Sequence, residues 1–182
     1  MPNIDLREFR VAATLRNGLG VSIRSIRPDD RERLLRAFRG LERETVYRRL
    51  FRYVSEPTPE QLRRATEPDP DREAALVVTV ASGEEERIIA GGRYVAAAPG
   101  SAERVAEIAF TVEEDYQGLG IAGLLLRHLA EIARRRGISA FEADVLSGNA
   151  SMLRVFARGG LPMQQRRDGG VIHVRLSLAE PR

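Results

Sequence analysis

The hydrophobic period of the chain switches at residues 113–123, and this switch constrains the fold more than any other feature. Residues 104–112 alternate apolar with other side chains, as a strand does, whereas apolar residues recur with helical spacing over 121–132. The loop between the two elements contains Gly118, Gly120 and Gly123. Glycines let successive backbone N–H groups converge on an anion, and a helix N-terminus adds partial positive charge. The segment therefore predicts a strand, a phosphate-binding loop and a helix in succession.

Two other interpretations fit the same loop. A plain strand-to-helix turn would use the glycines without binding a ligand. The three glycines also match the G-x-G-x-x-G fingerprint of dinucleotide binding, with Glu142 or Asp144 near the spacing of the ribose-binding acid. In that fingerprint the strand runs almost directly into the first glycine, whereas residues 113–117 intervene here. The preceding strand also closes an antiparallel meander, so the dinucleotide interpretation is disfavoured but stays open.

The rest of the chain predicts one α/β domain with a mixed, mostly antiparallel sheet over residues 21–180. Residues 1–20 are polar and end in a turn, so we expect an N-terminal arm or a short extension there. Alternation and turn residues predict the strands, which are 21–26, 74–80, 87–97, 104–112, 138–146, 163–167 and 171–178. Helical spacing predicts helices that open at 27–30 with Leu34, Leu35 and Phe38 inward, at 42–52 with Val46, Leu50 and Tyr53 inward, around Leu62, at 118–136 and at 149–158.

The composition excludes several kinds of chemistry. All 29 basic residues are arginine, and the chain contains neither lysine nor cysteine. A P-loop lysine, a Schiff-base lysine, a thiolate nucleophile and a cysteine-ligated zinc site are therefore excluded. The net charge is only +3 and basic residues alternate with acidic ones, which indicates solvated helix faces and not a nucleic-acid partner. The chain lacks a long apolar run and an apolar signal core, so we expect a cytoplasmic protein with no membrane partner.

Several segments resemble the GNAT superfamily of N-acetyltransferases. The loop Gln117-x-x-Gly120-x-Ala122 is similar to the family's pyrophosphate-binding motif, and residues 106–112 look like the strand before it. Residues 149–162 resemble the family's Asn-containing helix and the turn that follows, and residues 26–30 resemble its usual start. The resemblance covers residues 21–178 in the right order. Within the family, residues 47–51 and the strand that contains Glu107 look most like bacterial protein lysine acetyltransferases.

The resemblance implies the GNAT fold and acetyl-CoA as the co-substrate, with no metal. It also implies that strand residues hydrogen-bond the pantetheine arm, that a backbone N–H near Phe110 polarises the thioester carbonyl, and that loop residues bind the pyrophosphate. The residues expected to contact the cofactor are Phe110, Thr111, Val112, Gln117, Gly118, Leu119, Gly120, Ile121, Ala122, Gly123, Asn149, Met152 and Phe156. The expected acceptor is a protein lysine, such as one on an acyl-CoA synthetase, and a homodimer is common in the family. A small amine as acceptor, or a non-catalytic acyl-CoA sensor, are the alternatives.

Glu107 is the candidate general base. It is a lone carboxylate inside an otherwise apolar strand, and alternation places it on one face with Ala109 and Thr111. Partial burial would raise its pKa toward the range that is useful for a base. The matching glutamate in the resembled lysine acetyltransferases serves as the base. The structural alternative is a salt bridge from Glu107 to an arginine such as Arg93.

The acid for the leaving thiolate is a gap in the sequence. Many GNAT enzymes have a tyrosine where this chain has Phe156, so either another group protonates the sulfur or the thiolate leaves unprotonated. Tyr94 and Tyr116 are possible substitutes, although each also suits a packing role. His128 and His173 are expected to be structural, because they are distant in sequence and have no metal-ligand spacing.

Overall fold

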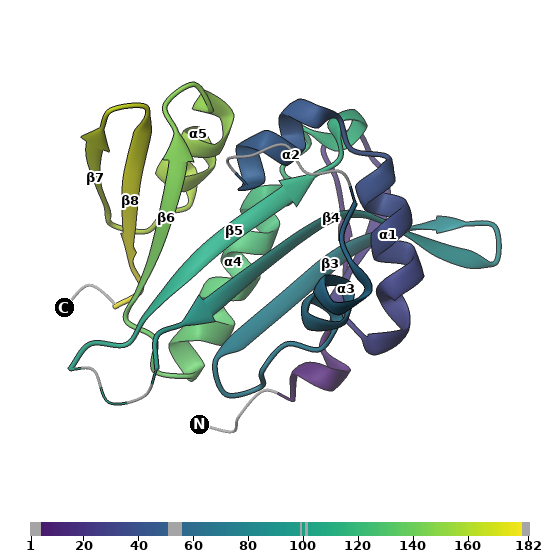
Figure 1. The fold of residues 1–182 in the computed structure, drawn as a ribbon, viewed down its shortest axis with the longest axis horizontal. Coiled ribbons are helices and arrows are strands. Elements are labelled where there is room, and N and C mark those ends of the chain that lie inside the picture. Colours follow the sequence, from purple (N-terminus) through teal and green to yellow (C-terminus); the bar gives the residue numbers. More distant parts are fainter. Residues whose placement is uncertain (1–4, 51–55, 99, 101, 180–182) are drawn as a thin grey trace.

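The computed structural model describes residues 5–50, 56–98, 100 and 102–179. Eight strands form one sheet in the order β1-β2-β3-β4-β5-β6-β8-β7, and all neighbours are antiparallel except β5 and β6 (Figure 1). The strands are β1 (Arg10–Thr14), β2 (Gly20–Ser25), β3 (Glu73–Ser82), β4 (Glu85–Ala96), β5 (Val105–Val112), β6 (Ala140–Leu146), β7 (Met163–Asp168) and β8 (Val171–Ser177). The helices are η1 (Leu6–Glu8), η2 (Pro28–Asp30), α1 (Arg31–Arg39), α2 (Arg43–Leu50), α3 (Pro59–Thr66), η3 (Glu114–Tyr116), α4 (Ile121–Arg135) and α5 (Ala150–Arg158).

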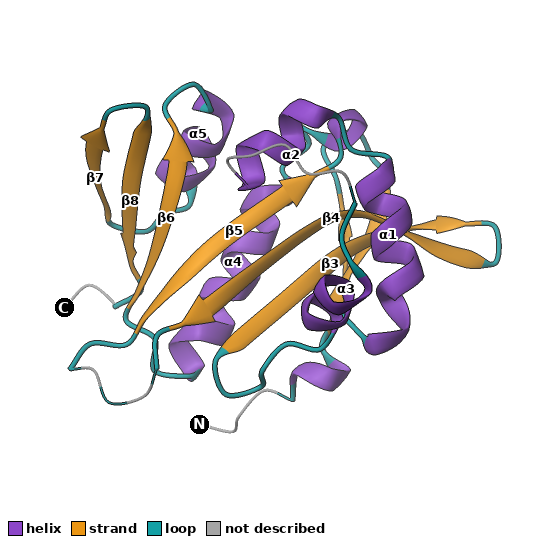
Figure 2. Ribbon diagram, viewed as in Figure 1, coloured by secondary structure: helices purple, strands orange, loops and turns teal. Residues whose placement is uncertain are grey.

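Helices cover the two faces of the sheet unequally. Helices α4 and α5 lie behind the sheet, whereas α1, α2 and α3 lie in front of its N-terminal half (Figure 2). The main core lies under α4, where the side chains of Leu125 and Leu129 are fully buried against the sheet residues Tyr94 and Phe141. The front of β6, β8 and β7 carries no described helix, and Glu142 on β6 is exposed there. One half of the front face is therefore open beside β5.

Strands β5 and β6 pair at one end and then separate. Their parallel register covers only Val105–Glu107 of β5, opposite 140–142 of β6. Beyond that point β5 stays paired with β4 as far as Val112, while β6 continues with β8 (Figure 1). Among the described residues, no strand pairs with the β6-facing edge of 108–112. A backbone edge without a partner is a ready acceptor for another extended chain.

Part of the N-terminal segment belongs to the sheet. Strand β1 pairs with β2 over its whole length, with Arg10 opposite Arg24 and Thr14 opposite Gly20. The turn between them is fixed because the Leu15 N–H donates to the Leu19 carbonyl oxygen at 2.9 Å and the Leu15 side chain is buried. The segment expected as an arm or short extension thus contributes the edge strand of the sheet.

A buried ion pair joins β2 to η2. The guanidinium of Arg24, 1% exposed, donates to both carboxylate oxygens of Asp30 at 2.7 and 2.8 Å, and to Glu86 at 2.9 Å. The Arg27 N–H donates a further hydrogen bond of 2.9 Å to Asp30. These contacts raise the pKa of Arg24. Burial acts to raise the pKa of Asp30, but the hydrogen bonds from Arg24 and the Arg27 N–H hold it below its usual value.

Most predicted elements form, with local differences. The expected inward position of Val46 on α2 is confirmed, but that of Leu50 is wrong, because its side chain is 40% exposed at the end of the helix. Arg52 and Tyr53, which the prediction placed in the same helix, lie outside the described residues. The 3-10 helix η3 was not predicted, and it occupies residues that the sequence suggested were loop.

Candidate active site

The glycine loop has the backbone geometry that an anion site needs. Gly118 and Gly120 have φ values of 78° and 90°, in the left-handed region that favours glycine. Gly120 is also the N-cap of α4 and provides no side-chain cap, so the first N–H groups of the helix have no side-chain acceptor. Ile121 buries its side chain in the core and presents only its backbone to the loop. These N–H groups and the positive end of α4 suit a pyrophosphate.

The other loop residues take different positions. Leu119 and Ala122 pack their side chains against the core, whereas Gln117, Gly118 and Gly123 are exposed. The amide Nε2 of Gln117 donates to the Val112 carbonyl oxygen at 3.0 Å. This contact joins the loop to the end of β5, so the segments expected to bind the pyrophosphate and the pantetheine arm are adjacent.

Arg16 lies against the glycine loop, a contact that the sequence did not predict. Its Nη1 donates to the Gly118 carbonyl oxygen at 3.4 Å, and its Nε lies 3.5 Å from where a Cβ of Gly120 would be. The fixed turn between β1 and β2 positions it. The guanidinium has five N–H donors, and this one long hydrogen bond is the only contact that the described residues make with them.

Glu107 lies at the point where β5 leaves β6. It faces Glu142 in the last of the three β5–β6 pairs, and its side chain is exposed. The expectation that partial burial prepares this carboxylate is therefore wrong, since the front of the sheet is open beside it. The structural alternative, a salt bridge from Glu107 to Arg93, does not form, because Arg93 pairs with Glu73. Phe110, by contrast, points into the core on the opposite face.

Two arginines lie on the same side of the sheet as Glu107. Arg93 pairs in register with Ala109, two residues from Glu107, so the three side chains share one face. Arg49 extends from α2, which packs on β5, and its side chain is half-buried. Burial lowers the pKa of Arg49, and the positive charge of Arg93 lowers it further, while the negative charge of Glu107 partly opposes both effects. Arg49 is thus a desolvated cation beside the candidate base.

The two tyrosines suggested as acids each contact an arginine. Tyr94 is completely buried on the α4 side of the sheet, and burial raises its pKa. Its hydroxyl lies 3.4 Å from Arg136 Nη1. The hydroxyl of Tyr116 accepts a hydrogen bond of 2.8 Å from Arg87. Tyr94 is therefore structural in this fold, and Tyr116 is tied to Arg87 on β4.

Asn149 caps the start of α5. The Asn149 side chain accepts from the Met152 N–H at 3.3 Å, which satisfies one orphan donor of the helix. The Met152 side chain is half-buried and packs against the core. Phe156 is buried against Phe110, with ring centroids 6.1 Å apart. Contacts of these residues with the cofactor stay predictions.

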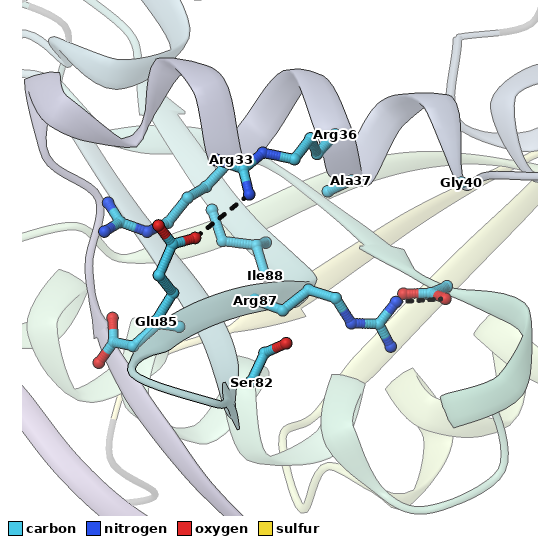
Figure 3. Close-up of a pocket in the computed structure, with 10 residues that line it drawn as sticks. Arg33, Arg36, Ala37, Gly40, Ser82, Glu85, Arg87 and Ile88 are labelled. Carbon is cyan, nitrogen blue, oxygen red and sulfur yellow. Dashed lines mark hydrogen bonds and ion pairs between the residues drawn. The ribbon is translucent and has the colours of Figure 1, made fainter.

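The two histidines and a pocket beside α1 do not include Glu107 or any of the loop glycines. His128 contacts the Phe9 ring, and His173 bonds Asp144, as structural side chains do. No cluster of potential metal ligands occurs among the described residues. The pocket in Figure 3 lies between α1 and the turn that joins β3 to β4. Two ion pairs join its lining residues, Arg36–Glu85 and Arg87–Glu113, both at 3.3 Å.

The described part of the chain has no helix that is long and apolar enough to cross a membrane.

The sheet is not the parallel, doubly wound one that the dinucleotide interpretation requires, because only β5 and β6 are parallel. The dinucleotide interpretation of the glycine loop is therefore wrong.

Comparison with known proteins agrees with this geometry. The chain is 32% identical over 167 residues to acetyltransferase PA5475 of Pseudomonas aeruginosa, covering 91% of this chain and 88% of that protein. It is 35% identical to acetyltransferase Pat of Mycolicibacterium smegmatis over 89% of its length, but spans only 47% of that relative. The crystal structure of the GNAT domain of S. lividans PAT superimposes with a TM-score of 0.82 at 31% identity, over 92% of this chain and 96% of that one. Residues 41–160 match the acetyltransferase (GNAT) family profile, and the chain therefore belongs to the GNAT acetyltransferase family.

Proposed function

We propose that this GNAT acetyltransferase transfers the acetyl group of acetyl-CoA to a lysine of a protein acceptor, such as an acyl-CoA synthetase. One observation carries the proposal: an exposed carboxylate, Glu107, lies where an unpaired strand edge begins. That edge and the glycine loop at its far end fit an extended pantetheine arm and a pyrophosphate. The acetyl end of the arm would then lie beside Glu107.

The proposed mechanism gives each group one task. Bound acetyl-CoA supplies the acetyl thioester. Glu107 accepts the proton that the acceptor ammonium must lose, directly or through water. A backbone N–H near Phe110 donates to the thioester carbonyl oxygen where negative charge develops. The thiolate leaves unprotonated, because Phe156 has no hydroxyl, Tyr94 is buried, and a thiolate is a good leaving group.

Arg16 is proposed as a further contact of the cofactor. Its guanidinium lies over Gly118 and Gly120 and makes only one long hydrogen bond with the described residues. A planar guanidinium with spare donors suits the bidentate recognition of a phosphate. The backbone loop and this side chain from the β1–β2 turn would then hold the pyrophosphate from two sides.

Two features support a protein acceptor over a small amine. The front of β6, β8 and β7 has no described helix, so a large partner can approach Glu107 from that side (Figure 2). Leu50 presents an exposed apolar side chain at the end of α2, and α2 packs on β5, the strand that contains Glu107. The relatives named Pat are consistent with this choice. A homodimer and a cytoplasmic location stay predictions.

The proposal is tested by thiol release from acetyl-CoA in the presence of either an acyl-CoA synthetase or a panel of small amines. The chain contains no lysine, so acetyl-lysine detected after the reaction comes only from the acceptor. We expect acetylation of the synthetase at a defined lysine. Thiol release with small amines but not with the synthetase would show that the acceptor is a small amine. It would leave the proposed mechanism of transfer unchanged.

A further inference from the structure

The half-buried guanidinium of Arg49 has no counterion in the described structure. Its side chain makes no hydrogen bond or ion pair with any described residue, although α2 packs it toward β5. Removing a charge from water is costly unless a partner of opposite charge compensates it. Arg24 in the same chain shows the usual solution, because two carboxylates surround it. A cation that is desolvated but unpaired is prepared to receive an anion.

Arg93 strengthens the positive charge at this place. Its Nη2 donates to Glu73, but its Nε is buried and has no hydrogen-bond acceptor among the described residues. Its charge acts on Arg49, as does that of Glu107. Of the carboxylates on this face, Glu73 pairs with Arg93 and Glu142 pairs with Arg175, whereas Glu107 has the proposed task of accepting a proton.

The position of Arg49 identifies which reactant would supply the anion. The proposed cofactor surface runs along the β6-facing edge of 108–112 to the glycine loop, at the end of β5 away from Glu107. Arg49 comes instead from α2, on the front face where the acceptor would approach Glu107. A carboxylate is the anion that matches a guanidinium fork in a bidentate manner.

We propose that the acceptor carries a carboxylate close to the reacting amine, and that Arg49 binds this carboxylate beside Glu107. This inference rests on the proposed function and narrows its acceptor. The carboxylate can belong to a free amino acid or to an acidic residue next to the acceptor lysine in a protein. The two sources share the same chemistry, and a matched set of acceptors distinguishes them.

The experiment compares acceptors that differ only in this charge. One arm offers L-amino acids and their carboxamides, with rates corrected for the fraction of free amine. The other offers capped lysine peptides with Glu or Gln beside the lysine. One of the two arms, free amino acids or lysine peptides, matches the natural acceptor. In that arm we expect kcat/KM to be about 10- to 100-fold higher for the acceptor with the carboxylate than for its neutral counterpart, as is typical of a hydrogen bond between charged groups.

Variants of α2 assign the preference to one side chain. Arg49→Gln should reduce the preference for the charged acceptor at least tenfold, mainly through KM, and Arg49→Lys should retain part of it. Arg48→Gln is the matched control, because Arg48 is the adjacent residue and pairs with Glu44 at 2.6 Å on the helix surface. It should leave the preference unchanged.

Each other outcome contradicts the inference in a recognisable way. Equal or better rates with the neutral member of each pair would overturn it and leave the proposed acetyl transfer standing. An equal loss for both members in Arg49→Gln would show that Arg49 supports only the fold of the site. If no acceptor that carries the carboxylate is acetylated in either arm, the inference is also overturned. If the synthetase and every neutral amine are not acetylated either, the proposed function fails as well.

Discussion

Arg24 and Arg49 are chemically identical side chains in opposite environments. Arg24 is 1% exposed and its guanidinium bonds Asp30 and Glu86, and these contacts raise its pKa. Arg49 is half-buried without such a partner, and burial lowers its pKa. The first arrangement is complete within the fold and therefore structural. The second is incomplete, and it lies beside Glu107, where a reactant can complete it.

The largest expected effect tests the structural side of this comparison. Arg24→Met leaves Asp30 buried without its main partner, so we expect a loss of about 3–5 kcal/mol in the free energy of unfolding. Denaturant unfolding measures it. Arg36→Met is the control, because Arg36 and Glu85 form an exposed pair at 3.3 Å, and its loss should stay below about 1 kcal/mol. Equal losses in the two variants would remove the distinction between buried and exposed arginines.

The acid limb of the stability curve tests the same pair. The pKa of Asp30 is lowered in the folded protein, so unfolding takes up protons once the pH falls below the unfolded value of about 3.9. The stabilisation from this carboxylate is therefore present above that pH and is lost as the pH falls through the folded pKa. Asp30→Asn should have a lower free energy of unfolding than wild type at neutral pH. The difference in free energy between the two proteins should become smaller in acid. A difference in free energy of unfolding that does not change with pH would show that the substitution acts through packing and not through charge.

A third arginine lies between the two extremes. Arg16 is exposed and makes one long contact with Gly118, and its proposed partner is the pyrophosphate. Arg16→Gln should weaken binding of CoA and of 3′-dephospho-CoA by about tenfold each, as one charged hydrogen bond predicts. Isothermal titration calorimetry measures this directly. Arg7→Gln, in η1 at the other end of β1, should leave both affinities unchanged, and a loss confined to CoA would assign Arg16 to the 3′-phosphate instead.

The smallest expected effect concerns the stability of the Arg49 variant. Because Arg49 has no described counterion, replacing it by Gln removes a desolvation cost and breaks no ion pair. The free energy of unfolding should stay the same or rise by up to about 1 kcal/mol. A loss of 2 kcal/mol or more would make Arg49 a structural residue like Arg24.

Sequence reasoning recovered the elements whose physics is local. The switch from alternation to helical spacing at the glycine loop located β5 and α4, and helical spacing also located α5. The exposed end of α2 was missed, because helical spacing places Leu50 inward but cannot show that the covered part of the sheet ends there.

Contacts between distant segments could not be predicted from a single sequence. Alternation placed Glu107 on the correct face, but its exposure depends on the absence of a helix over β6, a tertiary property. Arg16 lies 102 residues from Gly118 in the chain, and no local pattern links them. The unpaired state of Arg49 follows only from the positions of all neighbouring carboxylates. Charge content can be read from sequence, whereas charge pairing requires the fold.

The most direct test of the account is the rate of thiol release from acetyl-CoA by Glu107→Gln, with the unfolding free energy measured in parallel. As the general base, Glu107 should be needed for transfer but not for stability, so the rate should fall by about 10²-fold or more while the fold is unchanged. Glu142→Gln, which removes the same charge from the residue paired with Glu107 on β6, should change the rate little. An unchanged rate in Glu107→Gln, or an equal fall in both variants, would contradict the assignment of Glu107 as the base.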